Sequence, residues 1–324
     1  MTDHILEVSN FSVKFPLIKR GLLSRQVGEF TAVNNVSFSV QRGSSLGIVG
    51  ESGSGKTTLV RAILRAIDPA SGSAVFQSQA GAVDLCQLSD KELIPLRTQM
   101  QMIFQDPFAS LNPRMKVADI VSEPLVIHRP EQHREHRQMV VHMLERVGLE
   151  ADTLHRFPHA FSGGQRQRIG IARALILNPS LVICDEAVSA LDVSVQAQVL
   201  NLLKDLQEEL GLTYLFISHN LAVVDYVADR VAVMCAGRIV ESAPREVLFR
   251  NPMHPYTQAL LAAVPKADPG SKLDLTALMQ GKASVPSSWP KPFTLDESIV
   301  ADMIDAGGGH YVWAEAGAQL PREI

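Results

Sequence analysis

Residues 50–58 read Gly50-Glu51-Ser52-Gly53-Ser54-Gly55-Lys56-Thr57-Thr58, which fits the pattern G-x-x-x-x-G-K-[ST] of a phosphate-binding loop. A short apolar run, Leu46–Val49, precedes the loop and a helical pattern, Thr57–Ile67, follows it. In this context the glycines let backbone N–H groups surround a triphosphate, and the helix offers its positive end. We expect Lys56 to reach the β- and γ-phosphates and the Thr57 hydroxyl to bind Mg²⁺. The alternative, a glycine turn with a chance lysine, does not explain the strand before and the helix after.

A second apolar run, Leu181–Cys184, ends in the two carboxylates Asp185 and Glu186. A pair at the carboxyl end of a parallel strand lies at the sheet edge where ligands bind. We expect Asp185 to hold Mg²⁺ through its water shell. We expect Glu186 to polarise an attacking water, a role that contributes roughly 10²–10⁴ in rate. The alternative is an acidic pair that caps a helix.

The segments around these motifs predict an α/β fold. Tyr214–Ile217 is a further unalternated apolar run, and Val195–Leu210 is helical by its period, so the core alternates strand and helix over a parallel sheet. Near the N-terminus, Leu6–Val13 and Val36–Val40 alternate apolar and polar residues as strands do. We interpret Lys19–Glu29, between them, as an insertion.

The composition of the chain argues against several classes of protein. The chain has 324 residues, a net charge of −4 and a pI of about 6.2, so it shows no basic footprint for nucleic acid. Its three cysteines, Cys86, Cys184 and Cys235, form no CxxC pair, which argues against disulfides, zinc or an iron–sulfur cage and suits a reducing cytosol. We see no signal peptide and no run of the about 20 apolar residues that span a bilayer, so a membrane role requires a partner.

A second anion-binding helix start narrows the choice among phosphate-loop proteins. Ser162-Gly163-Gly164-Gln165 opens a helical run, Arg166–Leu177. One ATP does not need two phosphate cradles in one chain, so the second is expected to serve the nucleotide of a neighbour. The alternative is an ordinary helix cap.

With these motifs in order, the chain resembles the nucleotide-binding subunits of ABC transporters from about residue 5 to 265. By that resemblance residues 50–58 are the Walker A loop, Gln105 is the Q-loop residue and Ser162–Gln165 are the signature. Asp185 and Glu186 end Walker B, Ser189–Asp192 are the D-loop, and His219 is the switch histidine.

The resemblance implies ATP and Mg²⁺ as cofactors and assigns a role to each site residue. The catalytic residues are Glu186, His219 and Gln105. The metal ligands are Thr57, Gln105 and Asp185. The nucleotide-binding residues are Phe15, Gly50, Ser52, Gly53, Ser54, Gly55, Lys56, Thr57, Thr58, Ser162, Gly163, Gly164, Gln165 and Asp192. Asp192 is also expected to cap the next helix.

The adenine-stacking aromatic is Phe15, with Phe30 as the alternative across the insertion. An aromatic residue in a strand is more often part of the core. The sequence departs from the family pattern at Phe161, where leucine is usual, and at Ala187, where proline usually follows the Walker B glutamate. Neither change removes a catalytic atom, and the second is expected to loosen the turn that positions Glu186.

The implied fold is α/β: a P-loop NTPase (RecA-like) core with an antiparallel β subdomain, an inserted helical signature subdomain at about 108–175 and a C-terminal extension. The nucleotide-binding domain is expected at 1–250 and the extension at 251–324. Within the extension, residues 267–295 are rich in proline, serine and glycine and predict a linker or loose tail.

Two segments resemble the oligopeptide/dipeptide importer group: Phe104–Met115 after the Q-loop and His254–Leu261 after the core. The first lies where such subunits dock a permease. The second begins the group's C-terminal extension, although the cysteine cluster found in many relatives is absent, since Cys235 is the last cysteine. Nickel, sugar-conjugate or opine-like solutes therefore stay open beside peptides.

The resemblance also implies the partners and the place of the protein. These are two transmembrane permease subunits, a second ATPase, identical or paralogous, and indirectly a periplasmic solute-binding protein, with no nucleic acid. The expected location is the cytoplasmic face of a bacterial inner membrane, as a peripheral protein. Two alternatives are a soluble ABC ATPase acting on ribosomes or DNA and a component of a metabolic complex such as carbon–phosphorus lyase. The first usually has two cassettes or a long coiled coil, and this chain has one signature and no sustained heptads.

Overall fold

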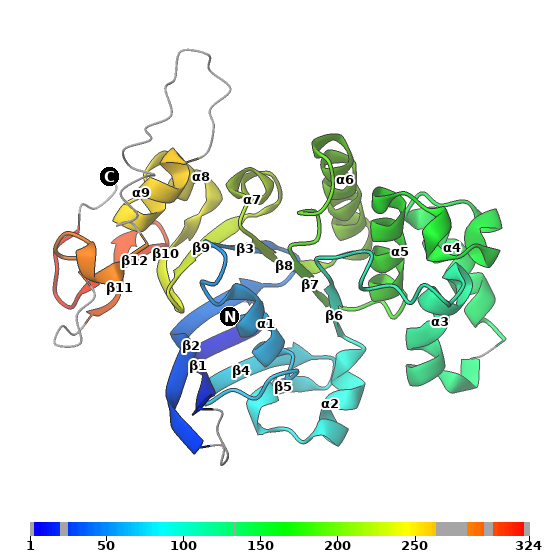
Figure 1. Ribbon diagram of the computed structural model, residues 1–324, viewed down its shortest axis with the longest axis horizontal. Helices are drawn as coiled ribbons and strands as arrows, with labels where there is room; N and C mark the ends of the chain where they lie inside the picture. The colour runs from blue at the N-terminus through cyan, green and yellow to red at the C-terminus, as the bar shows by residue number, and fades with distance from the viewer. Residues whose placement is uncertain (1–2, 20–24, 133, 264–283, 295–300, 321–324) are drawn as a thin grey trace. The chain divides into compact units, whose positions relative to one another are not determined.

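The computed structural model describes residues 3–19, 25–132, 134–263, 284–294 and 301–320 (Figure 1). The chain divides into two compact units, each built from several stretches of sequence. The first unit comprises Met1–Leu6, Val40–Ser45 and Val75–Ile217. The second comprises Glu7–Ser39, Leu46–Ala74 and Ser218–Ile324.

In the first unit, three short strands form a parallel layer: β6 (Met100–Ile103), β7 (Leu181–Asp185) and β8 (Thr213–Ser218). Every residue of β7 and β8 is buried, which explains why both read as unbroken apolar runs. Helix α6 (Val193–Leu210) connects them and ends at Gly211, whose φ is +63°. The predicted strand–helix–strand alternation is confirmed.

Three helices of the first unit pack on one another: α3 (Val117–His128), α4 (His136–Arg146) and α5 (Gly163–Leu175). They lie together in the green part of Figure 1. Short 3₁₀ turns connect them, at Pro130–Gln132, Ala151–His155 and Pro158–Ala160. The same unit also holds the 3₁₀ turn Leu85–Gln87 and helix α2 (Asp90–Arg97), which begins with a capping box between Ser89 and Glu92.

The second unit has a mixed sheet in the order β11-β12-β10-β9-β3. Its strands are β3 (Ser45–Val49), β9 (Arg230–Cys235), β10 (Arg238–Pro244), β11 (Ala301–Gly307) and β12 (His310–Glu315). β3 runs parallel to β9, and the remaining pairs are antiparallel. Its helices are α1 (Lys56–Ile63), α7 (Leu221–Val227), α8 (Arg245–Arg250) and α9 (Pro255–Ala262).

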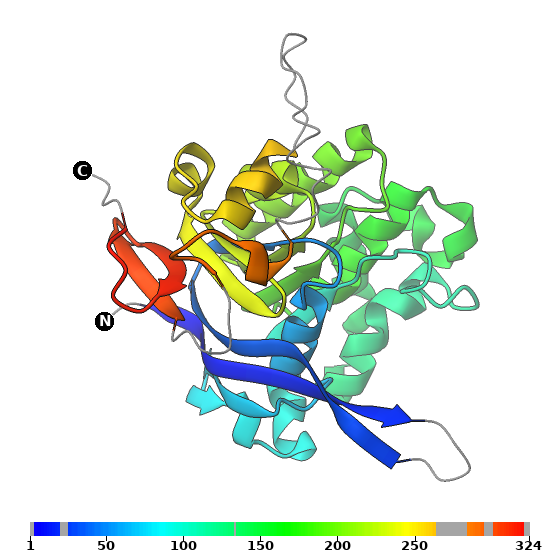
Figure 2. The same cartoon turned by 60° about the vertical axis from the view of Figure 1, so that its left-hand side comes forward.

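A long antiparallel ribbon replaces the two short strands predicted near the N-terminus. β1 runs from His4 to Lys19 and β2 from Arg25 to Gln41, and both extend well past the predicted ends (Figure 2). The insertion predicted at Lys19–Glu29 was therefore wrong for 25–29, which continue β2; residues 20–24 lie outside the described residues. In the second unit the order is β2-β1-β4, and β4 (Ser71–Ser78) continues into the first unit, where it pairs with β5 (Gly81–Asp84).

The predicted loose tail is also wrong where the structure describes it. Residues 284–294 include a 3₁₀ turn, Pro286–Ser288, followed by Trp289, which is only 4% exposed. The Trp289 ring packs on His254, with 4.5 Å between ring centroids, and Phe293 lies against the same histidine. Buried aromatic area offsets the cost of ordering a proline-rich segment. The rest of the predicted tail, 267–283 and 295, lies outside the described residues.

Among the described residues, Cys86, Cys184 and Cys235 form no disulfide. Burial raises the pKa of Cys235 to about 12 and raises that of Cys184 even further from its ordinary value. Cys86 is half-buried. In the described ranges, no three His, Cys, Asp or Glu side chains come together as a metal site, and no helix there has the length and apolarity to span a bilayer.

Candidate functional site

The phosphate loop joins β3 to α1 in the second unit, as the sequence predicts. Helix α1 begins at Lys56, directly after Gly55, whose φ is +105°. A Cβ atom at Gly55 would lie 2.4 Å from the carbonyl oxygen of Ala32, and one at Gly50 would lie 2.1 Å from that of Met234. These two glycines are therefore required by close backbone approach as well as by conformation.

The Lys56 side chain folds back into the phosphate loop. Its side chain is 4% exposed, and its ammonium donates to the carbonyl oxygens of Gly50 and Glu51, both at 2.7 Å, and to the Ser54 hydroxyl at 3.3 Å. These three oxygens fix the position of the ammonium group. A loop of glycine N–H groups around a buried ammonium fits a polyphosphate anion.

In the first unit, Gln105 and Glu186 meet although 81 residues separate them. The Gln105 amide Nε2 donates to Glu186 Oε2 at 2.7 Å. Because a carboxylate accepts and does not donate, the amide nitrogen must face Glu186, and Oε1 stays the amide atom available to a cation. Asp185, one residue earlier, ends buried β7 and is 3% exposed.

The turn after Glu186 is closed by several hydrogen bonds. Glu186 has a φ of +49°, an uncommon conformation for a residue other than glycine. Its N–H donates to the Ile217 carbonyl at 2.9 Å, and its own carbonyl accepts from the Ser189 N–H and hydroxyl, both at 3.0 Å. Ala187 is 4% exposed. The expected loosening by Ala187 is therefore opposed by bonds on both sides of Glu186.

The signature residues open α5 through a reciprocal capping box. The Ser162 hydroxyl accepts from the Gln165 N–H at 3.3 Å, and Gln165 Oε1 accepts from the Ser162 N–H at 3.0 Å. Gly164 is buried, and a Cβ atom there would lie 2.4 Å from Val195 Cγ1. The helix-cap alternative is thus realised in the structure, and a cap and an anion-binding helix start are compatible, since both use the same end of the helix.

Asp192 caps α6, as expected. Its Oδ1 accepts from the Val195 N–H at 3.0 Å and from the Ser194 hydroxyl at 2.7 Å. These hydrogen bonds hold the pKa of Asp192 below its ordinary value, and the one from the Ser194 hydroxyl has the largest effect.

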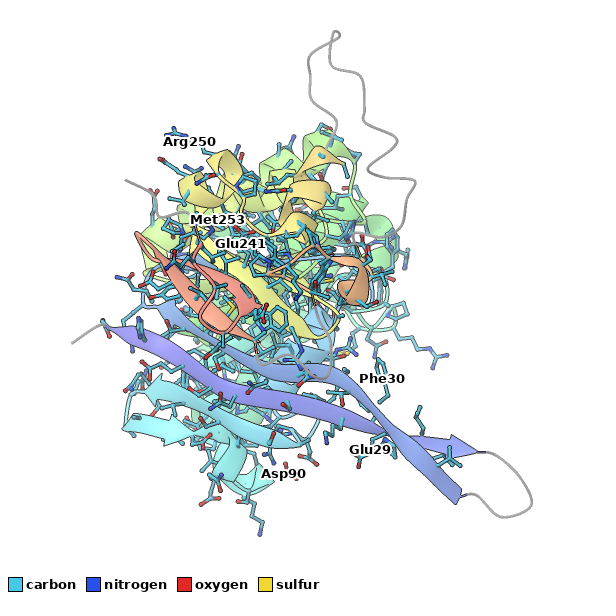
Figure 3. All side chains as sticks on the ribbon, turned by 90° about the vertical axis from the view of Figure 1, so that its left-hand side faces the viewer. Glu29, Phe30, Asp90, Glu241, Arg250 and Met253 are labelled. Atoms are coloured by element: carbon cyan, nitrogen blue, oxygen red, sulfur yellow. The ribbon has the colours of Figure 1, made fainter. Side chains whose placement is uncertain are left out.

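His219 and the two candidate aromatics lie in the second unit and are accessible. His219 is exposed and follows β8, in the turn where the Asn220 N–H donates to the Ser218 hydroxyl at 2.9 Å. Phe15 in β1 is 36% exposed and Phe30 in β2 is 55% exposed, so neither belongs to the core. Phe30 and its neighbour Glu29 project from opposite faces of the ribbon (Figure 3).

Two arginines of α5 hold the segment that follows Gln105. The Arg166 guanidinium lies over the Phe108 ring, 4.2 Å from its centroid, and Arg173 donates to the Ser110 carbonyl at 2.7 Å. Burial lowers the pKa of Arg173. Phe108 itself stays 58% exposed. The helix that carries the signature is therefore tied directly to the Phe104–Met115 segment.

The site residues thus divide between the two units. The first holds Gln105, Asp185, Glu186, Asp192 and the signature, Ser162–Gln165. The second holds Phe15, His219 and the whole loop Gly50–Thr58. The structure places Gln105 in hydrogen-bond contact with Glu186, and the Lys56 ammonium in contact with the loop carbonyls of Gly50 and Glu51. It also adds two residues that the sequence did not single out, since Tyr256 and Ser284 both bind Glu51 of the loop.

Two family models match the chain. The ABC transporter model matches residues 33–189, and the model described as oligopeptide/dipeptide transporter, C-terminal region, matches residues 240–287. The first range contains the phosphate loop, Gln105, the signature and Glu186, and the second contains α9.

Known relatives cover most of the chain. The oligopeptide transport ATP-binding protein AppF of Bacillus subtilis (strain 168) is 50% identical over 291 residues, which are 89% of this chain and 87% of the relative. The probable peptide ABC transporter ATP-binding protein y4tS of Sinorhizobium fredii (strain NBRC 101917 / NGR234) is 48% identical, over 90% of this chain and 80% of the relative. The glutathione import ATP-binding protein GsiA of Salmonella paratyphi A (strain ATCC 9150 / SARB42) is 48% identical over 96% of this chain, which spans 48% of that longer relative.

Solved structures agree with the predicted fold. The post-hydrolysis dimer of the ATP-binding cassette MJ0796, bound to ADP and Pi, matches with a TM-score of 0.64 and 27% identity, over 74% of this chain and 98% of that one. The structure of cbiO1 from Clostridium perfringens, part of the ABC transporter complex cbiONQ, also has a TM-score of 0.64 and 27% identity, over 77% and 92%. The predicted P-loop NTPase core is confirmed. Because half of the aligned residues are identical to those of AppF over most of both chains, this protein belongs to the ATP-binding subunits of ABC transporters, in their oligopeptide/dipeptide group.

Proposed function

We propose that this chain is the ATP-hydrolysing motor of an importer for oligopeptides, dipeptides or related small solutes, working at the cytoplasmic face of a bacterial inner membrane. The observation that carries the proposal is the buried Lys56 ammonium inside a glycine loop, in a chain that also pairs Gln105 with Glu186. The relatives named above are an oligopeptide transport protein, a probable peptide transporter subunit and a glutathione import protein, which supports a small peptide as the solute.

In this proposal each motif keeps the role expected from the sequence. Lys56 and the loop N–H groups bind the phosphates. Glu186 polarises the attacking water and His219 assists at the γ-phosphate. Gln105 senses the nucleotide, and its hydrogen bond to Glu186 supports this role because the two side chains must move together or separate.

The residues present also fit Mg²⁺ as the counter-ion of ATP. The proposed donors are the Thr57 hydroxyl, the Asp185 carboxylate through water and the Gln105 amide oxygen, which are the hard oxygen ligands that Mg²⁺ prefers. The observed Gln105 orientation suits this set, since its nitrogen faces Glu186. When bound, Mg²⁺ supplies charge neutralisation on the phosphates.

We further propose that the motor works as a head-to-tail pair. Each ATP would lie between Lys56 of one subunit and the signature, Ser162–Gly164, of the other. Closure of the pair would draw the Gln105 regions together and switch two permease subunits that receive solute from a periplasmic binding protein. The second ATPase is either identical or paralogous. The contacts of Arg166 and Arg173 with the segment after Gln105 support this transmission, because they link the signature helix directly to that segment.

A Glu186→Gln variant tests the chemistry. It keeps the size of the side chain and the buried turn but removes the base, so we expect kcat for ATP hydrolysis to fall by about 10²–10⁴ with ATP binding retained. Glu208→Gln, at an exposed position on α6, is the matched control. Hydrolysis at the wild-type rate in Glu186→Gln would show that Glu186 is not the base.

Co-expression with permease subunits tests the transport role. We expect a membrane complex whose ATP hydrolysis rises when the cognate binding protein and candidate peptides are added. A membrane complex whose ATP hydrolysis does not respond to peptides would support the importer role and exclude peptides as the solute. Hydrolysis by a chain that forms no complex with a permease would favour a soluble or metabolic-complex ATPase instead.

A further inference from the structure

Glu51, the second residue of the phosphate loop, is held at three separate atoms. Its N–H donates to the Tyr256 hydroxyl at 3.0 Å, and its carboxylate Oε1 accepts from the Ser284 hydroxyl at 2.7 Å. Its carbonyl oxygen accepts from the Lys56 ammonium at 2.7 Å. Two of the three partners come from beyond residue 250, 205 and 233 residues further along the chain.

Tyr256 is rigidly placed to make this contact. Its side chain is 1% exposed, at the start of α9, and its ring lies 6.4 Å from that of Trp289 between centroids. Burial raises the pKa of the Tyr256 hydroxyl, so the group stays neutral at physiological pH. A neutral hydroxyl can accept from the Glu51 N–H without placing a negative charge beside the phosphate site.

One buried carboxylate, that of Glu241, binds both the turn before α9 and strand β12. Glu241 of β10 is fully buried and accepts from the N–H groups of Met253 and His254, at 2.7 and 3.1 Å, and from His310 Nε2 of β12 at 2.7 Å. Glu241 and Met253 lie close together beneath the yellow helices in Figure 3. The C-terminal hairpin, the turn before α9 and Tyr256 are therefore one connected structure.

This connection matters because the same part of the loop also holds the phosphate-binding Lys56. The Glu51 N–H shares a planar peptide unit with the Gly50 carbonyl oxygen, one of the two carbonyl oxygens that orient the Lys56 ammonium. If the Glu51 N–H loses its fixed acceptor, that peptide can rotate, and the lysine loses a defined position. ATP binding must then also order the loop, which lowers affinity.

We propose that the C-terminal extension sets the nucleotide affinity of the phosphate loop through Glu51, with Tyr256 as a positioning residue and Ser284 as a second contact. The inference rests on the proposed ATP-binding role of the loop. It gives this extension, which the family model describes only as a C-terminal region, a part in the ATPase site itself.

The test compares nucleotide binding by wild type, Tyr256→Phe and Ser284→Ala in the full chain, with mant-ATP fluorescence and steady-state hydrolysis. Tyr256→Phe removes one hydroxyl from a buried ring, so we expect Kd and KM for ATP to rise by about 3- to 10-fold while kcat at saturating ATP changes by less than about twofold. Ser284→Ala should raise Kd by about twofold, since its partner carboxylate is exposed. In the double variant Kd should rise by less than the product of the two single-variant factors, because both residues act on Glu51.

Tyr311→Phe is the matched control, since it removes a hydroxyl from an exposed tyrosine of β12 in the same unit. A merely structural role for Tyr256 would lower the melting temperature and the active fraction with Kd unchanged, and that result would overturn the inference. Should Tyr256→Phe fail to fold, an unchanged Kd in Ser284→Ala would overturn it as well. Wild-type protein that binds no mant-ATP would instead reject the proposed function.

Discussion

Acidification should destabilise the protein through His254, which is fully buried at the start of α9. Its Nδ1 accepts from the Tyr256 N–H at 3.2 Å, so the neutral ring carries its proton on Nε2, an atom without a hydrogen-bond partner among the described residues. Burial lowers the pKa of His254 from 6.5 to about 3. Protonation of Nδ1 would also break the helix cap, because the ring could no longer accept.

The sign and size of the effect follow from linkage. Below pH 6.5 the unfolded chain binds a proton at this position and the folded chain does not until about pH 3, so stability falls as pH falls through this window. The free energy of unfolding drops by about 1.4 kcal/mol per pH unit within it, which gives about 2 kcal/mol between pH 7 and pH 5. This figure depends on the unfolded pKa alone, since the folded pKa lies below the range.

The variant His254→Asn isolates this contribution. Asparagine can accept from the Tyr256 N–H as an N-cap but does not titrate, so any cost of the smaller side chain is independent of pH. We expect wild type to lose about 2 kcal/mol more than the variant between pH 7 and pH 5 in urea denaturation. Tryptophan fluorescence is the readout, because Trp289 packs directly on His254. The other titrating groups contribute equally to both proteins, so parallel pH curves would refute the assignment.

Three further outcomes are expected. Gly55→Ala should weaken ATP binding at least about tenfold in a mant-ATP titration, because its Cβ would lie 2.4 Å from the Ala32 carbonyl oxygen and its φ is positive. Gly43 also has a positive φ but has open space around it, so the control Gly43→Ala should leave ATP binding unchanged. Glu241→Ala should lower the free energy of unfolding by about 3 kcal/mol or more in urea denaturation, since three donors, two of them fully buried, lose their acceptor. The exposed control, Glu246→Ala, should lower it by less than about 0.5 kcal/mol. Removal of Mg²⁺ with EDTA should stop hydrolysis, and added Mg²⁺ should restore it; activity that survives EDTA would contradict the proposed metal role.

The sequence predicted the parallel core well because those strands are buried on both sides and their helices keep a clear period. Leu181–Cys184 and Tyr214–Ile217 were found to within a residue or two of β7 and β8. The strands predicted at Leu6–Val13 and Val36–Val40 lie within β1 and β2, but the outer half of the ribbon was missed. That half is exposed and lacks the alternation that marks a half-buried strand. Phe30 and Glu29 illustrate this, because an aromatic and a charged residue are consecutive in the strand and both are exposed.

The tail was misread for a different reason. Proline and serine content predicts an extended or loose chain, whereas residues 284–294 form turns and a 3₁₀ helix. Composition cannot show that Trp289 packs on His254, 35 residues earlier in the chain. The site motifs were recognisable from local spacing. The bonds between Gln105 and Glu186, and between Glu51 and Tyr256, join residues 81 and 205 positions apart and depend on tertiary structure alone.

The burial of two of the three cysteines has a practical consequence for chemical labelling. The thiolate is the reactive form, and the raised pKa values of Cys184 and Cys235 keep both as thiols at neutral pH. Cys86, half-buried after β5, is therefore the position at which a maleimide or a mild oxidant reacts first. The native chain thus carries an attachment point for one fluorophore outside the sequence of the glycine loop, with no need to remove the other cysteines.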